Sequence, residues 1–264
     1  MVHPVMTRIL AYLELIKFRY HITYLTVVFA ALIFAGRIDL SLLRSLIQLY
    51  LCFNVLLYGG IYTLNDLRDL KSDRKHPRKR NRPIASGRVS PQAARVFSGV
   101  LIVSGLGSVL LFFGQAMFLV CLAMLGFNLF YSFVARNVPY LDLAINTATH
   151  PLRFLLGVLL TGRDAPLLHL AAYFVFVFGL SCLRRELEKD VTGWEARPTL
   201  KAYSLRTLRR LELASLVCIL GFLTADGMTS PGFYAVIIPT YLLIVAGAQL
   251  SPMIRSYLHH VWTR

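Results

Sequence analysis

The sequence has few charged residues, no closely spaced pair of cysteines and no recognisable leader, and each absence excludes a class of protein. Charged residues make up 16% of the 264 positions, whereas globular domains average about 25%. A mean hydropathy of +0.61 is too high for a core surrounded by water. The four cysteines lie in four different apolar runs without a CxxC pair, so we expect neither a zinc site nor a disulfide framework. Residues 1–21 mix charge with apolar positions and lack a small-residue cleavage site, so we expect an interfacial helix there instead of a signal peptide.

Long apolar runs fill most of the remaining sequence. A helix that spans a bilayer needs about 20 apolar residues, and most of the runs reach this length once their amphipathic flanks are counted. We therefore predict an all-α fold, a polytopic transmembrane helical bundle of about eight to nine spans in a single domain covering residues 1–264. The runs cover residues 24–36, 42–64, 96–114, 116–134, 140–162, 168–183, 213–225 and 233–250.

The net charge of +15 is concentrated in two segments between apolar runs. Residues 66–90 hold nine of the 28 lysines and arginines, and residues 184–210 hold eight. Cytoplasmic loops of membrane proteins carry such an excess, so we expect loops 65–90 and 184–210 and both termini at the cytoplasmic face. The predicted location is the inner (plasma) membrane of a bacterium or archaeon. Because the basic residues lie in membrane-edge loops and not along a soluble face, we expect no nucleic-acid partner.

The two halves of the chain share a layout. Each half has two apolar runs, a long charged segment and two more runs, and the charged segments start near residues 65 and 185. Membrane folds built from internal repeats often bind their ligand at the repeat interface. We therefore predict two four-span pseudo-repeats around a central cavity, with the two charged loops contributing to one site.

The first charged segment combines acidic and basic residues in a pattern that suits a metal-bound phosphate. Asn65, Asp66, Asp69 and Asp73 follow one another at helical spacing and share one face if the helix continues past Leu64. Three crowded carboxylates need a cation, and Mg²⁺ is usually bound through one or two carboxylates plus substrate phosphates. A solvated loop of ordinary ion pairs is the alternative. The basic residues that follow, whose donors match phosphate oxygens, are Arg74, Lys75, Arg78, Lys79, Arg80 and Arg82.

Polar residues inside the apolar runs indicate a second region of interest. Asp142, Asn146, His150 and Arg153 recur at spacings of four, four and three, which places them in one stripe. Ionisable groups at membrane depth are costly and mark functional cavities. Hydrogen bonds that merely hold neighbouring helices together are the alternative, and for Asn128 the two readings are equally supported. The substrate-binding candidates from the spans are Asn128, Tyr131 and Arg153.

The second charged segment begins with paired arginines followed by acids. Arg184, Arg185, Glu188 and Asp190 close the sixth run, with Glu186 beside them. The arginines make this cluster better suited to phosphate than to a metal. A positive-inside anchor for the sixth span is the alternative reading.

The motif N65-D-L-R-D-L-K-S-D73 resembles the first aspartate-rich motif, NDxxDxxxD, of the UbiA superfamily of intramembrane prenyltransferases, and R82-P-I-A-S-G87 is similar to the segment that follows it there. The longer stretch DRKHPRKRNRPIASG resembles the polyprenyl-phosphate (decaprenyl-phosphate) phosphoribosyltransferase branch. R184-R-E-L-E188 is similar to that branch's K-R-x-x-E. The second DxxD-type motif of other members is incomplete, because Thr192, Gly193 and Trp194 follow Asp190.

This resemblance implies roles for individual residues. Asp66, Asp69 and Asp73 would hold Mg²⁺ on a diphosphate, and Asn65 would orient one of them. Glu188 or Asp190 would bind ribose hydroxyls or a second metal, and a lipid chain would lie among the helices. The residues expected to hold phosphates are Lys79, Arg80, Arg82, Arg184 and Arg185.

The resemblance also implies the chemistry. Our leading hypothesis is a Mg²⁺-dependent membrane-embedded transferase that displaces pyrophosphate from an activated donor, most specifically by 5-phosphoribosyl transfer from phosphoribosyl diphosphate to a polyprenyl phosphate. A prenyltransferase that moves a prenyl group from a prenyl diphosphate to an aromatic or other small acceptor is the first alternative. A non-catalytic lipid-binding or transport bundle is the second.

Overall fold

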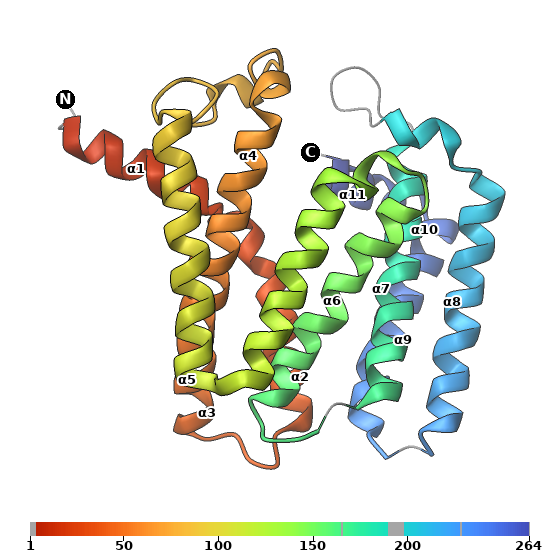
Figure 1. The fold of residues 1–264 in the computed structure, drawn as a ribbon. Coiled ribbons are helices and arrows are strands. Elements are labelled where there is room, and N and C mark those ends of the chain that lie inside the picture. The colour runs from red at the N-terminus through yellow and green to blue at the C-terminus, as the bar shows by residue number, and fades with distance from the viewer. Residues whose placement is uncertain (1–3, 165, 190–197, 228, 264) are drawn as a thin grey trace. The chain divides into compact units, whose positions relative to one another are not determined.

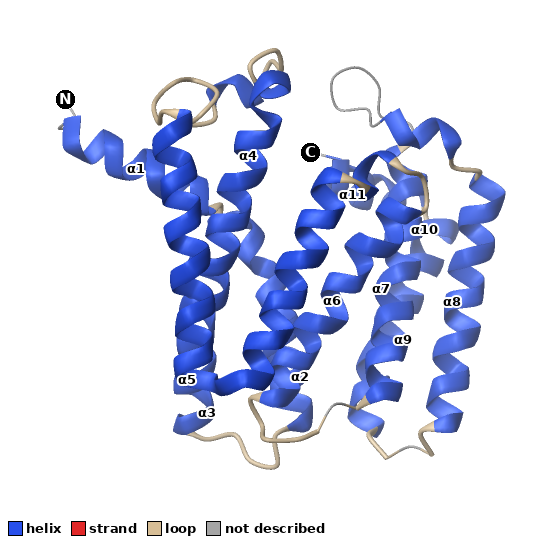
Figure 2. Cartoon of the chain, in the orientation of Figure 1, coloured by secondary structure: helices blue, strands red, loops and turns tan. Residues whose placement is uncertain are grey.

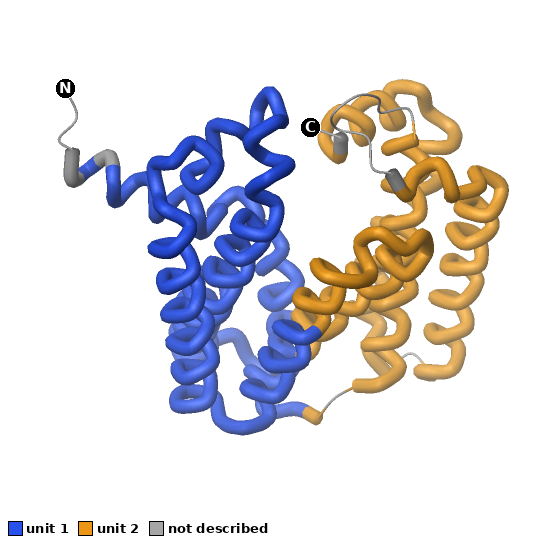
Figure 3. Tube along the Cα trace, turned by 45° about the horizontal axis from the view of Figure 1, so that its top comes forward, with its two compact units in different colours: residues 1–126, 156–163 blue, residues 127–155, 164–264 orange. Residues whose placement is uncertain are grey.

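The computed structural model describes residues 4–164, 166–189, 198–227 and 229–263. Within these ranges the chain forms helices joined by loops and turns, without a strand (Figures 1 and 2). The contacts divide it into two compact units (Figure 3): unit 1 comprises residues 1–126 and 156–163, and unit 2 comprises residues 127–155 and 164–264. The prediction of an all-helical fold is confirmed.

Unit 1 contains the first charged segment. The segment expected to be a loop over residues 65–90 starts as helix, because α4 runs unbroken from Gly59 to Asp73. Helix α1 packs against α4, and the turn η1 packs against the π-helical segment η2. The elements of unit 1 are α1 (Pro4–Ile16), η1 (Phe18–Tyr24), α2 (Leu25–Phe34), α3 (Leu40–Leu49), η2 (Tyr50–Tyr58), α4 (Gly59–Asp73), η3 (Lys79–Asn81) and the first part of α5 (Pro91–Phe133).

Helix α5 contains two of the expected apolar runs. Its 43 residues are interrupted at Gly114, where φ is 80° and ψ is −175°, and the chain changes direction there (Figure 1). A continuous helix of that length would measure about 65 Å, twice the thickness of a hydrocarbon core. The left-handed backbone at Gly114, which a glycine adopts without steric cost, therefore separates the runs 96–114 and 116–134.

Close backbone contact fixes η2 and α4 against α5. A Cβ at Gly105 of α5 would lie 2.6 Å from the backbone nitrogen of Leu57, and one at Gly60 would lie 2.9 Å from the carbonyl oxygen of Ser98. The Ser98 hydroxyl donates to the Gly60 carbonyl at 2.8 Å. Small residues at such positions let membrane helices approach closely. The start of α4, and with it the register of its acidic face, is thereby set by α5.

Unit 2 is organised around α7. This helix packs against α8, α9 and α11, and its last turns carry the start of the second charged segment. The expected loop 184–210 is again partly helical, because α7 continues to Glu188 and α8 begins at Leu205. The elements of unit 2 are the end of α5, η4 (Ala135–Asn137), most of α6 (Leu141–Leu159), α7 (Leu167–Glu188), η6 (Pro198–Ala202), α8 (Leu205–Ala225), α9 (Pro231–Tyr241), η7 (Leu242–Ala246), α10 (Gly247–Leu250) and α11 (Pro252–Thr263).

Fewer helices meet a strict criterion for spanning than the eight to nine expected. Among the described residues, five stretches are long and apolar enough to cross a membrane, and one of them, α5, contains two expected runs. Helices α6 and α8 are not among the five. Polar residues explain this, because α6 carries the stripe from Asp142 to Arg153 and α8 begins with Arg206, Arg209 and Arg210. The five stretches are Arg8–Phe34, Leu40–Asp73, Pro91–Phe133, Leu167–Glu188 and Pro231–Leu250.

Candidate functional sites

The acidic face of α4 is the first candidate site. Asp66 and Asp73 are buried, with 3% and 4% of their surfaces exposed. One nitrogen of Arg82, Nη1, donates to Asp66 Oδ1 at 3.0 Å and to Asp73 Oδ2 at 2.8 Å. Because a single nitrogen contacts both carboxylates, the two acids lie close together on the same side of the helix, as their spacing of seven residues predicts.

A second cation reaches this face from a distant part of unit 1. Lys17 Nζ lies 2.6 Å from Asp66 Oδ1. Lys17 links α1 to η1 and has a left-handed backbone with φ of 57°, which is uncommon for a non-glycine residue. Sequence reasoning missed this residue. A left-handed linker cannot be read from residue types, and the contact depends on how α1 packs on α4.

The remaining predicted residues of the first segment are placed differently. Asp69 is half-buried and accepts from its neighbour Arg68, at 3.0 Å from Nε and 2.6 Å from Nη2. Asn65 is half-buried on the same helix. Lys79 and Arg80 lie on the short turn η3, half-buried and exposed respectively. Of the basic residues expected to bind phosphate, the structure brings Arg82 onto the acidic face.

The charges on the acidic face balance one another. Burial disfavours the charged guanidinium of Arg82, but the carboxylates of Asp66 and Asp73 outweigh this effect and raise its pKa above the usual range. Arg82 therefore stays charged at every accessible pH. Together with Lys17, it supplies two positive charges against two buried negative ones.

The donor set on α4 fits a divalent cation bound together with a phosphate ligand. Among the residues that the structure describes, no three His, Cys, Asp or Glu side chains gather closely enough to hold a metal by themselves. Mg²⁺ does not require such a cage, because it commonly uses one or two carboxylates and completes its shell with water and substrate phosphates. Asp66 and Asp73 supply the two carboxylates, and Asp69 lies between them in sequence.

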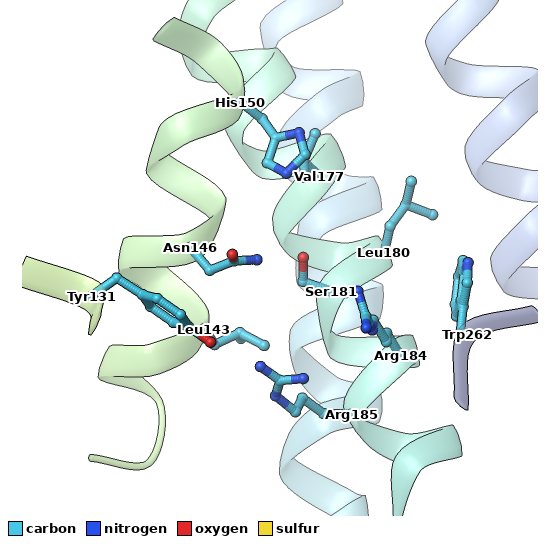
Figure 4. A pocket seen from close by; sticks show the side chains of 10 residues that line it. All are labelled: Tyr131, Leu143, Asn146, His150, Val177, Leu180, Ser181, Arg184, Arg185 and Trp262. Carbon is cyan, nitrogen blue, oxygen red and sulfur yellow. The ribbon is translucent and has the colours of Figure 1, made fainter. Parts of the chain in front are cut away.

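A pocket in unit 2 is the second candidate site. It has a volume of about 230 Å³ and is formed by α5, α6, α7 and α11 (Figure 4). Of the predicted substrate-binding residues, the structure places three in its wall, Tyr131, Arg184 and Arg185. The full lining is Tyr131, Leu143, Asn146, His150, Val177, Leu180, Ser181, Arg184, Arg185 and Trp262.

Arg185 is held rigidly in the wall of this pocket. Its Nη1 donates to Glu188 Oε2 at 2.6 Å, and its Nη2 donates to Asp142 Oδ2 at 3.0 Å. The side chain is only 4% exposed, and its Nε is buried without a hydrogen-bond partner in the described chain. An unsatisfied buried donor costs about 1–3 kcal/mol, so an acceptor that entered the pocket and reached this N–H would be bound favourably.

Arg184 is the more accessible of the pair. Its side chain is 45% exposed, and its Nε donates to Glu188 Oε1 at 2.9 Å. Its terminal nitrogens donate no recorded hydrogen bond to a residue that the structure describes. Glu188 therefore orients both guanidinium groups, although sequence reasoning gave it a role in binding ribose or metal. Arg184 keeps its outer edge for a ligand.

Asp142 connects this pocket to the second charged segment. Its carboxylate is fully buried and accepts hydrogen bonds from Arg185 and from the hydroxyl of Tyr203. The same hydroxyl accepts the backbone N–H of Tyr140 at 3.0 Å. Burial, and then the hydrogen bond to Asp142, raise the pKa of Tyr203 to about 12. Tyr203 thus remains a neutral donor that fixes Asp142.

Two other predicted residues, Arg153 and Asn128, are described by the structure and do not line the pocket. Arg153 is buried and donates to Thr149, at 3.1 Å to the hydroxyl and 3.4 Å to the carbonyl oxygen. Asn128 lies on α5 outside the lining set. Asp190 lies outside the described residues. Sequence reasoning missed Trp262, because it lies more than 70 positions from the other lining residues.

Two relatives show sequence similarity to parts of this chain. The decaprenyl-phosphate phosphoribosyltransferase of Corynebacterium glutamicum is 31% identical over 193 residues, which cover 69% of this chain and 57% of that relative. The digeranylgeranylglyceryl phosphate synthase of Methanocaldococcus jannaschii is 31% identical over 101 residues, 38% of this chain and 34% of that relative. Both matches span less than two thirds of the relative's own length.

A solved structure has the same fold. A UbiA homolog from Archaeoglobus fulgidus bound to DMAPP and Mg²⁺ superimposes with a TM-score of 0.75 at 17% identity, over 96% of this chain and 94% of that one. The model of the UbiA prenyltransferase family matches residues 24–260. This match covers most of the chain, including the acidic face of α4 and every residue of the pocket except Trp262, so the chain, a multi-pass integral membrane protein, belongs to the UbiA prenyltransferase family.

Proposed function

We propose that this protein is a Mg²⁺-dependent membrane transferase that moves a 5-phosphoribosyl group from phosphoribosyl diphosphate to a polyprenyl phosphate. The observation that carries the proposal is the pair Arg184 and Arg185 in a pocket that also has apolar walls. Guanidinium groups bind phosphate oxygens, and apolar walls suit a lipid. An acceptor that is itself a lipid phosphate matches both the guanidinium pair and the apolar walls. Similarity to the phosphoribosyltransferase of Corynebacterium glutamicum supports the same assignment.

The size of the pocket supports a compact polar group as its occupant. Pockets that enclose drug-sized ligands measure about 300–1,000 Å³, and this one measures about 230 Å³. The phosphate of the acceptor and the first part of its chain would fit, and the rest of the polyprenyl chain would lie among membrane lipids.

The acidic face of α4 would hold the donor's diphosphate through Mg²⁺. Asp66 and Asp73 would bind the ion, directly or through water, and Asp69 would complete the set. When bound, Mg²⁺ would neutralise charge on the departing pyrophosphate, a contribution of several kcal/mol. Arg82 and Lys17 already neutralise Asp66, and their donors would turn to phosphate oxygens once the ion is present. Asn65, Lys79 and Arg80 remain candidates for orienting this group.

The bond changes need charge stabilisation more than proton transfer. The bond between ribose C1 and the diphosphate oxygen breaks, and its electron pair leaves with pyrophosphate. A phosphate oxygen of the lipid then forms the new bond to C1, so no proton has to leave C1. The protein's task is to position both phosphates and to stabilise the developing charge, usually the largest catalytic contribution. Arg184 and Arg185, oriented by Glu188, would hold the attacking phosphate.

The proposal assumes the topology that the charge pattern predicts. The chain would cross the membrane about eight times as one functional domain, with two four-span repeats around a cavity. The segments 65–90 and 184–210 would face the cytoplasm, where phosphoribosyl diphosphate is soluble.

The proposal is tested with purified protein, Mg²⁺ and two substrate pairs. We expect pyrophosphate release with phosphoribosyl diphosphate plus decaprenyl phosphate, and loss of release in Asp66→Ala and Asp69→Ala. Release only with a prenyl diphosphate plus 4-hydroxybenzoate would contradict the proposal and favour a prenyltransferase. The similar UbiA homolog bound to DMAPP supports this alternative. No turnover with either pair, from protein that binds lipid normally, would favour a non-catalytic bundle.

A further inference from the structure

One wall of the unit 2 pocket comes from the C-terminal helix. Nine of the lining residues belong to α5, α6 and α7, and the tenth, Trp262, is on α11. Trp262 is half-buried. In Figure 4 its indole stands beside Leu180 and Arg184, while Tyr131 and Asn146 lie on the other side of the pocket. The pocket therefore has a polar side and a side where one guanidinium adjoins two apolar groups.

Helix α11 is held against α7 by an ion pair between the partly exposed Arg255 and the buried Glu186. Arg255 Nη1 donates to Glu186 Oε1 at 2.8 Å, and the Glu186 side chain is 0% exposed. Arg209 of α8 donates to both Glu186 oxygens at 3.1 and 3.2 Å, and Gln249 of α10 donates to Oε2 at 3.3 Å. We call this group, Glu186 with Arg209, Gln249 and Arg255, the C-terminal anchor.

The anchor and the pocket lie on the same face of α11 and on adjoining faces of α7. Arg255 and Trp262 are seven residues apart on α11, which places them on one face two turns apart. On α7, Glu186 directly follows the two arginines of the pocket. When Arg255 binds Glu186, Trp262 is therefore turned toward α7 as well. The anchor fixes the direction in which the indole points.

We infer that Trp262 determines specificity for the lipid substrate, its indole and Leu180 contacting the isoprene unit next to the phosphate that Arg184 binds. This inference rests on the proposed function for the identity of the lipid phosphate. The ligand that this pocket would take is a short amphiphile. Its phosphate would bind the guanidinium edge of Arg184, and its branched hydrocarbon would lie against the flat apolar surface of the indole. An indole offers a large apolar face at low cost in side-chain entropy.

A tryptophan near a helix end in a membrane protein has a simpler use as an interfacial anchor. That role would place the indole among lipid headgroups and would make it indifferent to what occupies the pocket. The contrast gives a direct measurement, because the chain has two tryptophans and Trp194→Phe leaves Trp262 as the sole reporter.

The first experiment titrates Trp194→Phe protein with three probes and follows indole emission. We expect geranyl phosphate to change the emission in a saturable way, with an affinity at least about tenfold higher than that of inorganic phosphate or of geraniol. Equal responses to geranyl phosphate and geraniol would overturn the inference, since they would show membrane partitioning only. No response to any probe would overturn it too.

The second experiment separates the two substrates kinetically. Trp262→Ala is expected to raise KM for the polyprenyl phosphate about tenfold, as the loss of contact with a few methyl groups implies, and to leave KM for the donor unchanged. Trp262→Phe should recover most of this loss. An effect confined to the donor's KM, or equal loss in the Phe and Ala variants, contradicts the assignment.

The anchor is tested as a positioning device. Arg255→Gln and Glu186→Gln should reproduce the rise in acceptor KM although neither residue lines the pocket, and the emission of Trp262 should shift to that of a more exposed indole. Met253→Ala, on the same helix and 77% exposed, is the matched control and should change neither quantity. Anchor variants with unchanged emission and KM would refute the positioning role.

The emission titration does not depend on the proposed reaction. If geranyl phosphate binds at Trp262 but phosphoribosyl diphosphate gives no turnover, the lipid-phosphate site stands and the phosphoribosyl assignment fails. If turnover occurs and the emission of Trp262 does not respond to geranyl phosphate, the phosphoribosyl assignment stands and the lipid-phosphate site at Trp262 fails.

Discussion

Lys17 reaches Asp66 across 49 positions of sequence, and this contact changes how the acidic motif is understood. A carboxylate that is 3% exposed needs compensation for its lost hydration. Lys17 and Arg82 both contact the same oxygen, Oδ1, at 2.6 and 3.0 Å. The motif is therefore neutralised by the protein's own cations in this state, and an arriving metal diphosphate would compete for the same carboxylates.

Replacing Lys17 tests how far the buried Asp66 carboxylate depends on the Lys17 ammonium group. Lys17→Met keeps the aliphatic stem and removes the charge, so Asp66 loses one of two charged donors, a cost of about 1.5–3 kcal/mol. We expect a lower melting temperature in thermal unfolding in detergent. Because the Lys17 ammonium would turn to a phosphate oxygen of the donor once Mg²⁺ is bound, we also expect kcat/KM for the donor, measured by pyrophosphate release, to fall about tenfold or more. Lys71→Met, at an exposed position of the same region, is the control. Equal behaviour of the two variants would show that the Lys17 contact is unimportant.

Tyr203 offers a second test at a single side chain. Tyr203→Phe removes a donor from buried Asp142 and leaves the Tyr140 N–H without its acceptor, so we expect a loss of about 1–3 kcal/mol. The pKa of Tyr203 is raised to about 12, above its unfolded value near 10. The stabilisation is therefore complete below pH 10 and is lost as pH rises through 12.

The difference in melting temperature between wild type and Tyr203→Phe should consequently stay constant from pH 6 to pH 9. Tyr257→Phe, at a position that is 67% exposed, should show no difference. A gap that closes within this range would mean that the hydroxyl titrates there, contrary to its burial.

Packing between elements decides where the acidic face of α4 points. Gly105→Ala would bring a methyl group within 2.6 Å of the Leu57 nitrogen and 3.0 Å of the Cys52 carbonyl oxygen. Backbone atoms cannot rotate away, so α5 has to move from η2, at a cost of about 1–3 kcal/mol. We expect a lower melting temperature, and a smaller rise in melting temperature when Mg²⁺ and pyrophosphate are added.

Gly107→Ala, two residues along the same helix, gives the matched comparison. A Cβ at this position meets nothing within 4 Å, and alanine favours a helix over glycine by about 1 kcal/mol. We therefore expect opposite signs for the two changes, destabilising at Gly105 and neutral or stabilising at Gly107. The same sign for both would mean that helix propensity, and not the close contact with η2, dominates.

The elements also show how far sequence reasoning reaches. The face shared by Asp66 and Asp73 could be predicted, because helical spacing is local and survives any tertiary arrangement. Arg184 and Arg185 could be singled out by their charge beside an apolar run. Lys17 and Trp262 could not, since their roles arise from packing between helices far apart in sequence. Spacing likewise predicted two runs around Gly114, whereas the direction of the chain there depends on a left-handed backbone.

Over the whole molecule, several buried acidic residues are paired with basic ones. The chain carries 28 basic and 13 acidic residues, and several buried acids take part in ion pairs: Asp66 and Asp73 with Arg82, Asp142 and Glu188 with Arg185, and Glu186 with Arg209 and Arg255. Each such pair satisfies a carboxylate that would otherwise be costly to bury. We therefore expect the folded chain to be stable without a bound divalent ion.

Removal of metal should thus separate activity from stability. We expect EDTA to stop pyrophosphate release while changing the melting temperature little, because Arg82 and Lys17 already neutralise Asp66. Mg²⁺ alone should also change it little, as it must compete with those two cations. Mg²⁺ with pyrophosphate should raise it, since ligand at 100 times its Kd adds about 2.7 kcal/mol to the folded state. In the double variant that combines Asp66→Asn and Asp73→Asn, the rise in melting temperature with Mg²⁺ and pyrophosphate should vanish. A melting temperature that falls sharply in EDTA would instead mean that the ion is structural and that Arg82 is not its substitute.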